Sequence, residues 1–393
     1  MSEGKELQVS GLHEKLEYAI KHYPFVQNTY STVMSFAFRT LGLVTPADKH
    51  LVLLSSMSGD QYSDSPKVLF EAMKKDPRFK NFHYVWAFKN PEKFRVPGAK
   101  KVKIDTYAYF KTAVQARIWI TNVNIERGLH FKKKDTVYLN TWHGTGPKKG
   151  GNAVKGRKDY DFSNVDIFCC DGQYTHDIFI KWFNAKDSSM LWCGRPREDE
   201  LFEFKPGDRE RIRRKLGVPE GKKMILYMPT WREHGEKHLN KTLWETELSD
   251  NYVVCVRQHH FDKSSGEDTA NNNFWIDATN YPDVNELYLA ADILISDYSS
   301  AFFDYGLLGK PMYCYAYDYD DYKKSYGLFM DLEKEFPSSV IRNEKQLIAA
   351  IKDMDYEQER KECKAYVARY VKHTENATQR CMDELYRRIR GSL

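Results

Sequence analysis

Short apolar runs alternate with helix-like segments along the first half of the chain. The runs are rich in β-branched and aromatic residues, which favour strands, whereas the intervening segments repeat apolar positions at helical spacing. Strand-like runs occupy residues 51–54, 84–88, 118–120, 137–139 and 165–170, and periodic segments occupy 67–73 and 174–183. This alternation predicts a parallel sheet covered by helices.

The same alternation restarts after a charged, proline-bearing stretch at residues 202–209, which is the best candidate for an interdomain linker. Strand-like runs follow at 224–228, 252–256, 274–276, 292–295 and 312–315. We therefore predict two α/β domains that face each other across a cleft, at residues 46–205 and 206–393. The helix-like residues 344–390 are expected to pack across the outside of the second domain.

Residues 1–45 form a separate segment that is predicted to be helical. Its apolar stretch at residues 30–44 fits two interpretations, a core helix or an amphipathic helix in the membrane interface aided by Lys15, Lys21 and Arg39. The first residues lack the apolar core of a signal peptide, and no stretch reaches the ~18 apolar residues that span a bilayer. We expect a protein of the cytoplasm, peripheral to the cytoplasmic face of the cell membrane.

The composition and net charge limit the kinds of binding partner that we expect. The 393 residues are 41% hydrophobic, which is ample for two cores, and the formal charge of +5 is modest. Such a charge suits an acidic ligand or an anionic membrane surface and is too diffuse to indicate nucleic acid. Seven cysteines show no C-x-x-C pair and mostly lie in apolar runs, so we expect buried thiols rather than a zinc site or disulfides.

Residues with acid–base and anion-binding chemistry follow several predicted strands. His143 and Thr145 come directly after the strand near residue 138, with Gly144 between them allowing a substrate close to the backbone. In the second half, Pro229-Thr230-Trp231-Arg232, Arg257-Gln258-His259-His260 and Ser296-Asp297-Tyr298-Ser299-Ser300 follow three strands. Since ligands bind at the carboxyl edge of parallel sheets, these groups predict an anion pocket.

Each of these residues also has a structural interpretation. A strand-end histidine can be a plain hydrogen-bonding group, Asp297 or Ser299 can cap a helix, and Arg257 can pair on the surface. Lys148-Lys149 is either a solvated pair or part of an electrostatic funnel for an acceptor. If residues 259 and 260 are extended, only one histidine faces the site, and we favour His259.

Other motifs are absent from the sequence. There is no Walker loop, G-x-G-x-x-G, H-E-x-x-H or G-x-S-x-G, and the acidic Asp318-Tyr319-Asp320-Asp321 is expected to be a solvated loop. We therefore predict no bound metal and no tightly bound cofactor.

Five motifs in order resemble those of the CDP-glycerol glycerophosphotransferases, the teichoic-acid primases and polymerases of Gram-positive bacteria. They are Trp142-His143-Gly144-Thr145, Gly194-x-Pro196-Arg197, Pro229-Thr230-Trp231-Arg232, Arg257-x-His259 and Asp297-Tyr298-Ser299-Ser300 with Phe303-Asp304. The resemblance covers about residues 51–332. It implies a GT-B architecture, two Rossmann-like domains facing across a cleft, attached to the inner membrane face.

The resemblance also implies the reaction and the roles of the residues. An acceptor hydroxyl would attack the β-phosphate of CDP-glycerol, or of CDP-ribitol, and CMP would leave. His143 and His259 would be the catalytic residues, with His143 the general base. The donor would be held by Gly144, Thr145, Arg197, Thr230, Trp231, Arg257, His259, Ser299, Ser300 and Asp304. The acceptor would be lipid-linked or polymeric.

The chain departs from the family at two places. Gly146-Pro147 stands where Pro-Leu is common, and Arg195 and Glu198 replace an aromatic residue and an asparagine. These changes put the acceptor and the polyol in doubt. Because the large N-terminal region of the long polymerases is missing, we expect a single-module transferase. A nucleotide-sugar glycosyltransferase and a non-enzymatic polymer-binding scaffold remain as alternatives.

Overall fold

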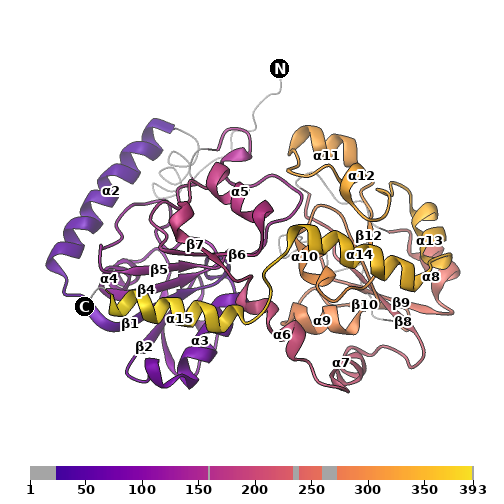
Figure 1. The fold of residues 1–393 in the computed structure, drawn as a ribbon, viewed down its shortest axis with the longest axis horizontal. Coiled ribbons are helices and arrows are strands. Elements are labelled where there is room, and N and C mark those ends of the chain that lie inside the picture. The colour runs from indigo at the N-terminus through magenta and orange to yellow at the C-terminus, as the bar shows by residue number, and fades with distance from the viewer. Residues whose placement is uncertain (1–23, 158–159, 233–238, 259–271, 392–393) are drawn as a thin grey trace, which may run out of the picture.

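Two parallel sheets, one in each half of the chain, form the framework of the protein (Figure 1). The computed structural model describes residues 24–157, 160–232, 239–258 and 272–391. The first sheet has the strand order β3-β2-β1-β4-β5-β6-β7 and the second β10-β9-β8-β11-β12. Every strand pairing within both sheets is parallel, which confirms the α/β prediction.

The strands coincide with the apolar runs of the sequence, because parallel strands are buried on both faces. The first sheet contains β1 (Asp48–Ser55), β2 (His83–Phe88), β3 (Ala99–Lys103), β4 (Ala116–Thr121), β5 (Val137–Asn140), β6 (Ile167–Cys170) and β7 (Met190–Trp192). The second contains β8 (Lys223–Tyr227), β9 (Tyr252–Val256), β10 (Trp275–Asp277), β11 (Ile293–Ser296) and β12 (Met312–Cys314). The lysine-rich edge strand β3 was not predicted.

Helices cover both sheets. Around the first lie α2 (Pro24–Val44), α3 (Asp64–Lys75), α4 (Tyr107–Gln115) and α5 (Gln173–Trp182). The second half contains α7 (Asp208–Leu216), α8 (Lys241–Leu248), α9 (Val284–Ala290), α10 (Ala301–Gly306), α11 (Tyr319–Ser325), α12 (Leu332–Glu335), α13 (Glu344–Lys352) and α14 (Tyr356–Tyr370). The short α6 (Glu200–Glu203) occupies the start of the predicted linker.

The last helix, α15 (Ala377–Arg390), corrects one prediction. Residues 344–390 were expected to cover the second domain, but α15 crosses back and packs on the first sheet (Figure 1). Its buried face, Cys381, Leu385 and Ile389 among it, joins the core of β1, β4 and β5, where it removes apolar side chains from water. On the crossing, the N–H groups of Lys372 and His373 donate to the carbonyl of Asp171, at the end of β6.

Helix α2 is partly a core helix. Phe38 is buried against Phe110 of α4, while Phe25, Val33, Phe36 and Leu43 are exposed. Arg39 donates to the carbonyl of His130, and Lys15 and Lys21 lie outside the described residues. No helix in the described part of the chain is long and apolar enough to cross a membrane.

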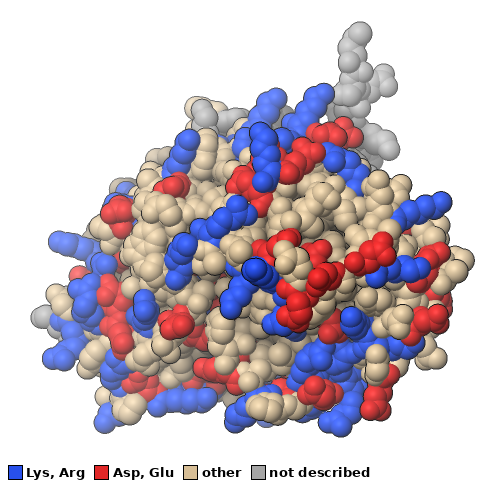
Figure 2. Space-filling model, turned by 45° about the vertical axis from the view of Figure 1, so that its right-hand side comes forward, with Lys and Arg blue, Asp and Glu red and all other residues tan. Residues whose placement is uncertain are grey.

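Charges of both signs are mixed on one face of the molecule. On the face in Figure 2, Lys and Arg side chains are interspersed with Asp and Glu.

The seven cysteines are free and buried, which confirms the prediction of buried thiols. Three of them, Cys169, Cys193 and Cys381, have sulfur atoms within 4.8 Å of one another inside the apolar core of the first sheet.

Candidate active site

His143 lies just after β5, as predicted, at the junction of the two halves. Its Nδ1 is 2.9 Å from the carbonyl oxygen of Asn122, which follows the neighbouring strand β4. Since a carbonyl can only accept, Nδ1 carries the proton and Nε2 of the neutral ring has a free lone pair. The Trp142 ring lies against the imidazole, with ring centroids 4.1 Å apart, and restricts its orientation.

The surroundings of His143 keep the imidazole neutral near pH 7. Burial lowers its pKa below the usual value, while the Asn122 carbonyl and the Asp64 carboxylate raise it. The positive charges of Arg197 and Lys148 lower the pKa further. A neutral imidazole with a free Nε2 can accept a proton from a bound hydroxyl group.

A cavity of about 320 Å³ lies beside His143 and is lined by five of the predicted donor-binding residues, Gly144, Thr230, Arg257, Ser299 and Ser300. Because β9, β8 and β11 are adjacent in the second sheet, the residues that follow them meet at one edge. The lining consists of Gln61, His143, Gly144, Gly146, Lys148, Met228, Pro229, Thr230, Arg257, Gln258, Thr279, Ser299 and Ser300. Hydroxyl groups, a guanidinium and a lysine are thus brought to face the imidazole.

The individual donors of this cavity are held in different ways. Arg257 uses one nitrogen to bond the carbonyl of Tyr281, at 2.6 Å. The backbone N–H of Thr230 donates to Asp297, and its hydroxyl has no partner within the described residues. The hydroxyl of Ser299 accepts from the N–H of Ala301, the first residue of α10. The N-cap position itself is Ser300, and Ser299 lines the cavity.

Gly144 and Gly146 allow the His143 loop to touch the loop that precedes α10. A Cβ on Gly144 would lie 2.4 Å from the hydroxyl oxygen of Ser300, and Gly144 has a φ of +127°. A Cβ on Gly146 would lie 2.7 Å from the backbone nitrogen of Ser300. The unusual Gly146 is therefore at the contact between the two halves.

A second set of contacts holds this loop from the other side. The N–H of Phe329 donates to the carbonyl of Pro147 at 2.7 Å, and the N–H of Lys149 donates to the carbonyl of Gly327 at 3.1 Å. Lys148 pairs with Leu328 in an antiparallel bridge. The lysine pair is therefore part of a backbone contact, and the side chain of Lys148 lines the small cavity.

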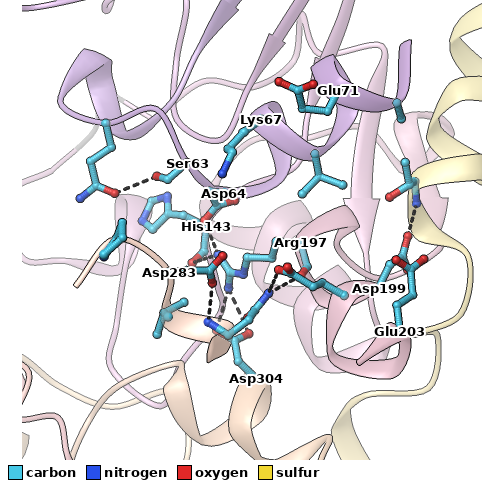
Figure 3. Close-up of a pocket in the computed structure, with 18 of the residues that line it drawn as sticks. Ser63, Asp64, Lys67, Glu71, His143, Arg197, Asp199, Glu203, Asp283 and Asp304 are labelled. Carbon is cyan, nitrogen blue, oxygen red and sulfur yellow. Dashed lines mark hydrogen bonds and ion pairs between the residues drawn. The ribbon is translucent and has the colours of Figure 1, made fainter. Parts of the chain in front are cut away.

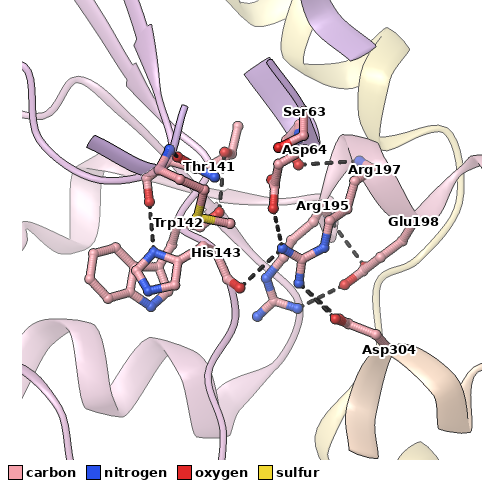
Figure 4. Close-up of polar contacts among 12 residues, drawn as sticks. Ser63, Asp64, Thr141, Trp142, His143, Arg195, Arg197, Glu198 and Asp304 are labelled. Atoms are coloured by element: carbon pink, nitrogen blue, oxygen red, sulfur yellow. Dashed lines mark hydrogen bonds and ion pairs between the residues drawn. The ribbon is translucent and has the colours of Figure 1, made fainter. Parts of the chain in front are cut away.

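Arg197 is buried between the two halves and is engaged on every side (Figure 4). One terminal nitrogen donates to Asp64 at 2.6 Å and to the carbonyl of His143 at 3.0 Å. The other donates to both oxygens of Asp304, in α10, at 3.0 and 2.8 Å. Arg197 and Asp304 were predicted to hold a donor, and the structure places them in contact with each other.

The two departures near Arg197 compensate each other. The Arg195 guanidinium lies 2.8 Å from Glu198 and 2.7 Å from Asp171, with all three side chains buried. Burial raises the pKa of Glu198 to about 7, and Arg195 opposes that rise. Neither Arg195 nor Glu198 lines the cavities beside His143, so these substitutions form an internal ion pair.

A larger cavity of about 810 Å³ opens on the other side of His143 (Figure 3). It is lined mainly by α3, α6 and the start of α9, and it shares Gln61, His143 and Arg257 with the small cavity. Lys67 of α3 points toward Asp64 and His143. The His143 side chain therefore lies on the wall that the small and the large cavity share.

Some predicted residues lie elsewhere. Trp231 is exposed and Thr145 is buried, and neither lines the two cavities. Arg232 is enclosed by Asp297 and Asp318, among tyrosine rings. The acidic stretch at 318 is therefore not a solvated loop: Asp318 forms a partly buried ion pair at the start of α11, and Asp320 and Asp321 are exposed on that helix. His259 lies outside the described residues.

Comparison with known proteins identifies the group to which this chain is related. A family profile described as CDP-Glycerol:Poly(glycerophosphate) glycerophosphotransferase matches residues 37–389. The chain belongs to this family.

Two curated relatives show how the lengths compare. A teichoic acid poly(glycerol phosphate) polymerase of Staphylococcus epidermidis is 34% identical over 77% of this chain, which spans 45% of that protein. A teichoic acid glycerol-phosphate transferase of Staphylococcus aureus is 31% identical over 78% of this chain and 85% of its own length. This chain thus spans less than half of the first relative and most of the second.

A solved structure of the wall teichoic acid polymerase TagF is similar in fold. It aligns with a TM-score of 0.81 at 30% identity, over 94% of this chain and 98% of the TagF chain. Another TagF structure, of a histidine-to-asparagine variant soaked with CDPG, aligns with a TM-score of 0.78.

Three residues of the site, Asn122, Asp64 and Asn285, were not predicted from the sequence. Asn122 follows a predicted strand, which was the available signal for its position. Asp64 stands before Ser65-Pro66, a pattern that marks a helix start without indicating a partner 133 positions away. Asn285, whose side chain donates to the carbonyl of Arg197 at 2.8 Å, carried no signal.

The contact at Gly146 can be tested by Gly146→Ala. The added Cβ would press on the backbone of Ser300, so we expect the free energy of unfolding to fall by about 1–3 kcal/mol. Gly150→Ala is the matched control, because its Cβ would meet only Phe183 at 3.7 Å. Denaturant unfolding followed by circular dichroism measures both. Equal stability of the two variants would contradict the contact.

Proposed function

We propose that this chain transfers glycerol phosphate from CDP-glycerol to an acceptor hydroxyl and releases CMP, in the synthesis of teichoic acid or a related cell-surface polymer. The observation that carries the proposal is that His143, with its Nδ1 bonded to Asn122 and its Nε2 left as the acceptor, lines one cavity together with Arg257, Ser299 and Ser300. Family membership and the teichoic-acid relatives support the same reaction.

In the proposed reaction, the acceptor oxygen attacks the β-phosphorus while Nε2 of His143 takes the hydroxyl proton. The bond from the β-phosphorus to the bridging oxygen breaks, and CMP leaves with the electron pair. Arg257 and the hydroxyl groups of Ser299 and Ser300 would stabilise charge on the phosphoryl oxygens. His259 keeps its predicted role beside the pyrophosphate.

The two cavities suggest where the substrates lie. The small cavity would take the donor pyrophosphate, with Gly144, Thr230 and Lys148 around it. The larger cavity would admit the acceptor, lipid-linked or polymeric, because it reaches the same imidazole from the other side. Thr145 and Trp231 would support donor binding from outside the two cavities, which neither residue lines, whereas Arg197 and Asp304 would hold the walls of the site together.

The two sheets and the cavities at their junction support a GT-B architecture of two Rossmann-like domains. We place the boundary near residue 205, between α6 and α7. The crossing after α14 would be a second connection, since α15 belongs to the first domain by its packing.

Release of CMP tests the function directly. The purified chain is incubated with an acceptor and either CDP-glycerol, CDP-ribitol or a UDP-sugar, and the nucleotide products are separated by chromatography. We expect acceptor-dependent CMP from CDP-glycerol. CMP from CDP-ribitol alone would indicate a ribitolphosphotransferase, UDP release would indicate a glycosyltransferase, and no release with any donor would leave only a scaffold.

The pH dependence tests the role of His143. Because the neutral imidazole is the base, kcat should fall as the pH drops through the pKa of His143, which burial places below the usual value of about 6.5. His143→Gln should lower kcat by about 10²–10⁴-fold and remove this limb of the profile. A variant that keeps the wild-type rate would rule out His143 as the base.

We also propose that the chain is peripheral to the cytoplasmic face of the membrane, attached through α2. Its exposed residues Phe25, Phe36 and Leu43 lie on one side of the helix, because their spacing is close to whole helical turns. Anionic lipid would suit the net positive charge.

Vesicle sedimentation tests this attachment. Phe36→Glu combined with Leu43→Glu should reduce binding to vesicles that contain phosphatidylglycerol by about tenfold or more, because charged groups are costly in the apolar layer. Phe202→Glu is the control, an exposed aromatic residue on α6. Unchanged binding of the double variant would exclude α2 as the anchor.

A further inference from the structure

Asp64, the first residue of α3, is buried at the junction of the two halves and has a left-handed backbone, with a φ of +62°. Residues other than glycine adopt this conformation rarely, and aspartate and asparagine tolerate it best. Such conformations persist where surrounding contacts hold them, and they gather at functional sites.

The contacts of Asp64 and its neighbour Ser65 hold Arg197 in place. One carboxylate oxygen accepts from the Arg197 guanidinium at 2.6 Å, and the other accepts from the N–H of Ser65. The hydroxyl of Ser65 in turn accepts from the backbone N–H of Arg197, at 3.2 Å. The start of α3 therefore holds Arg197 by its side chain and by its main chain.

Arg197, which α3 holds in place, also bonds the backbone of His143. The same nitrogen that meets Asp64 donates to the backbone carbonyl of His143 at 3.0 Å. The other terminal nitrogen reaches Asp304 in the second half. Both oxygens of Asp64 accept from protein groups, and the contact through which Asp64 reaches His143 is Arg197.

Asp64 also balances the charges around the imidazole. Burial opposes ionisation, but Arg197 and the Ser65 N–H hold the pKa of Asp64 below its usual value, so the carboxylate is charged at neutral pH. The charged groups that face His143 are Asp64 and Lys67 from α3, Arg197 before α6, Lys148 from its own loop, and Arg257 and Asp283 from the second half. Of these, Asp64 is the negative group that raises the pKa of the imidazole.

We propose that Asp64 is a positioning residue for His143: it fixes Arg197 between the two halves of the protein and, through Arg197, sets the place of the imidazole and the charge beside it. This inference rests on the proposed function for the role of His143 as a base. The contacts themselves are independent of that function.

Asp64→Asn removes the charge with little change of shape, and asparagine also accepts a left-handed backbone. We expect kcat for CMP release to fall by about 10–100-fold, because a small displacement of a reacting group has an effect of this size. The acidic limb of the pH–rate profile should move to lower pH, because the carboxylate that raises the pKa of His143 is gone. The KM for the donor should change less than kcat.

Two matched variants separate positioning from stability. Asp76→Asn disrupts another Asp–Arg pair, with Arg78, away from the two cavities, and should leave kcat and the pH profile unchanged. Ser65→Ala removes the contact to the Arg197 backbone without changing a charge, so it should lower kcat and leave the pH profile in place. The effect of Asp64→Asn should also shrink in an Arg197→Lys background, because the two residues act in one chain of contacts.

An NMR titration of the His143 ring, assigned by loss of its signal in His143→Gln, reads the same coupling without catalysis. We expect its pKa to be lower in Asp64→Asn than in the wild type. An unchanged pKa together with unchanged kcat would overturn the inference. A wild-type protein that releases no CMP would overturn the proposed function, while the titration would still decide whether Asp64 controls the imidazole.

Discussion

The buried Arg197 guanidinium is the interaction on which the site depends. It lies between Asp64 from the first half of the chain and Asp304 from the second, and it also donates to the backbone of His143. A buried arginine is costly unless each of its donors has a partner, so both carboxylates must come to it. Because Arg197 must contact both carboxylates and also bonds the backbone of His143, the position of the imidazole depends on how the two halves lie against each other.

The close approach of two loops follows from the same geometry. Gly144 and Gly146 leave no room for a side chain against Ser300, so the strand end that carries His143 touches the residues that precede α10. Arg257, which follows β9, lines the same cavity from the other side of β8 in the second sheet. A neutral imidazole from one sheet and a guanidinium and hydroxyl groups from the other thereby share one cavity, and the proposed phosphotransfer rests on this arrangement.

Much of this could be predicted from local patterns, and the remainder depends on contacts between distant segments. Buried parallel strands are short apolar runs, so the strand ends and the polar residues after them, His143, Thr230 and Ser299 among them, were visible in the sequence. The edge strand β3 is lysine-rich and was missed. The return of α15 to the first sheet and the partner of Asp64 were also not predictable, because amphipathic spacing shows that a face is buried but not against what.

In the proposed reaction, the two halves together transfer a polyol phosphate from a nucleotide to a hydroxyl group, with His143 as the base. ³¹P NMR of the complete reaction with CDP-glycerol and an acceptor follows this transfer directly. We expect the pyrophosphate signals to disappear while CMP and a new phosphodiester signal rise in equal amounts, and we expect His143→Gln to stop both. CMP accompanied by free glycerol phosphate, or a phosphodiester formed at the wild-type rate by the variant, would contradict it.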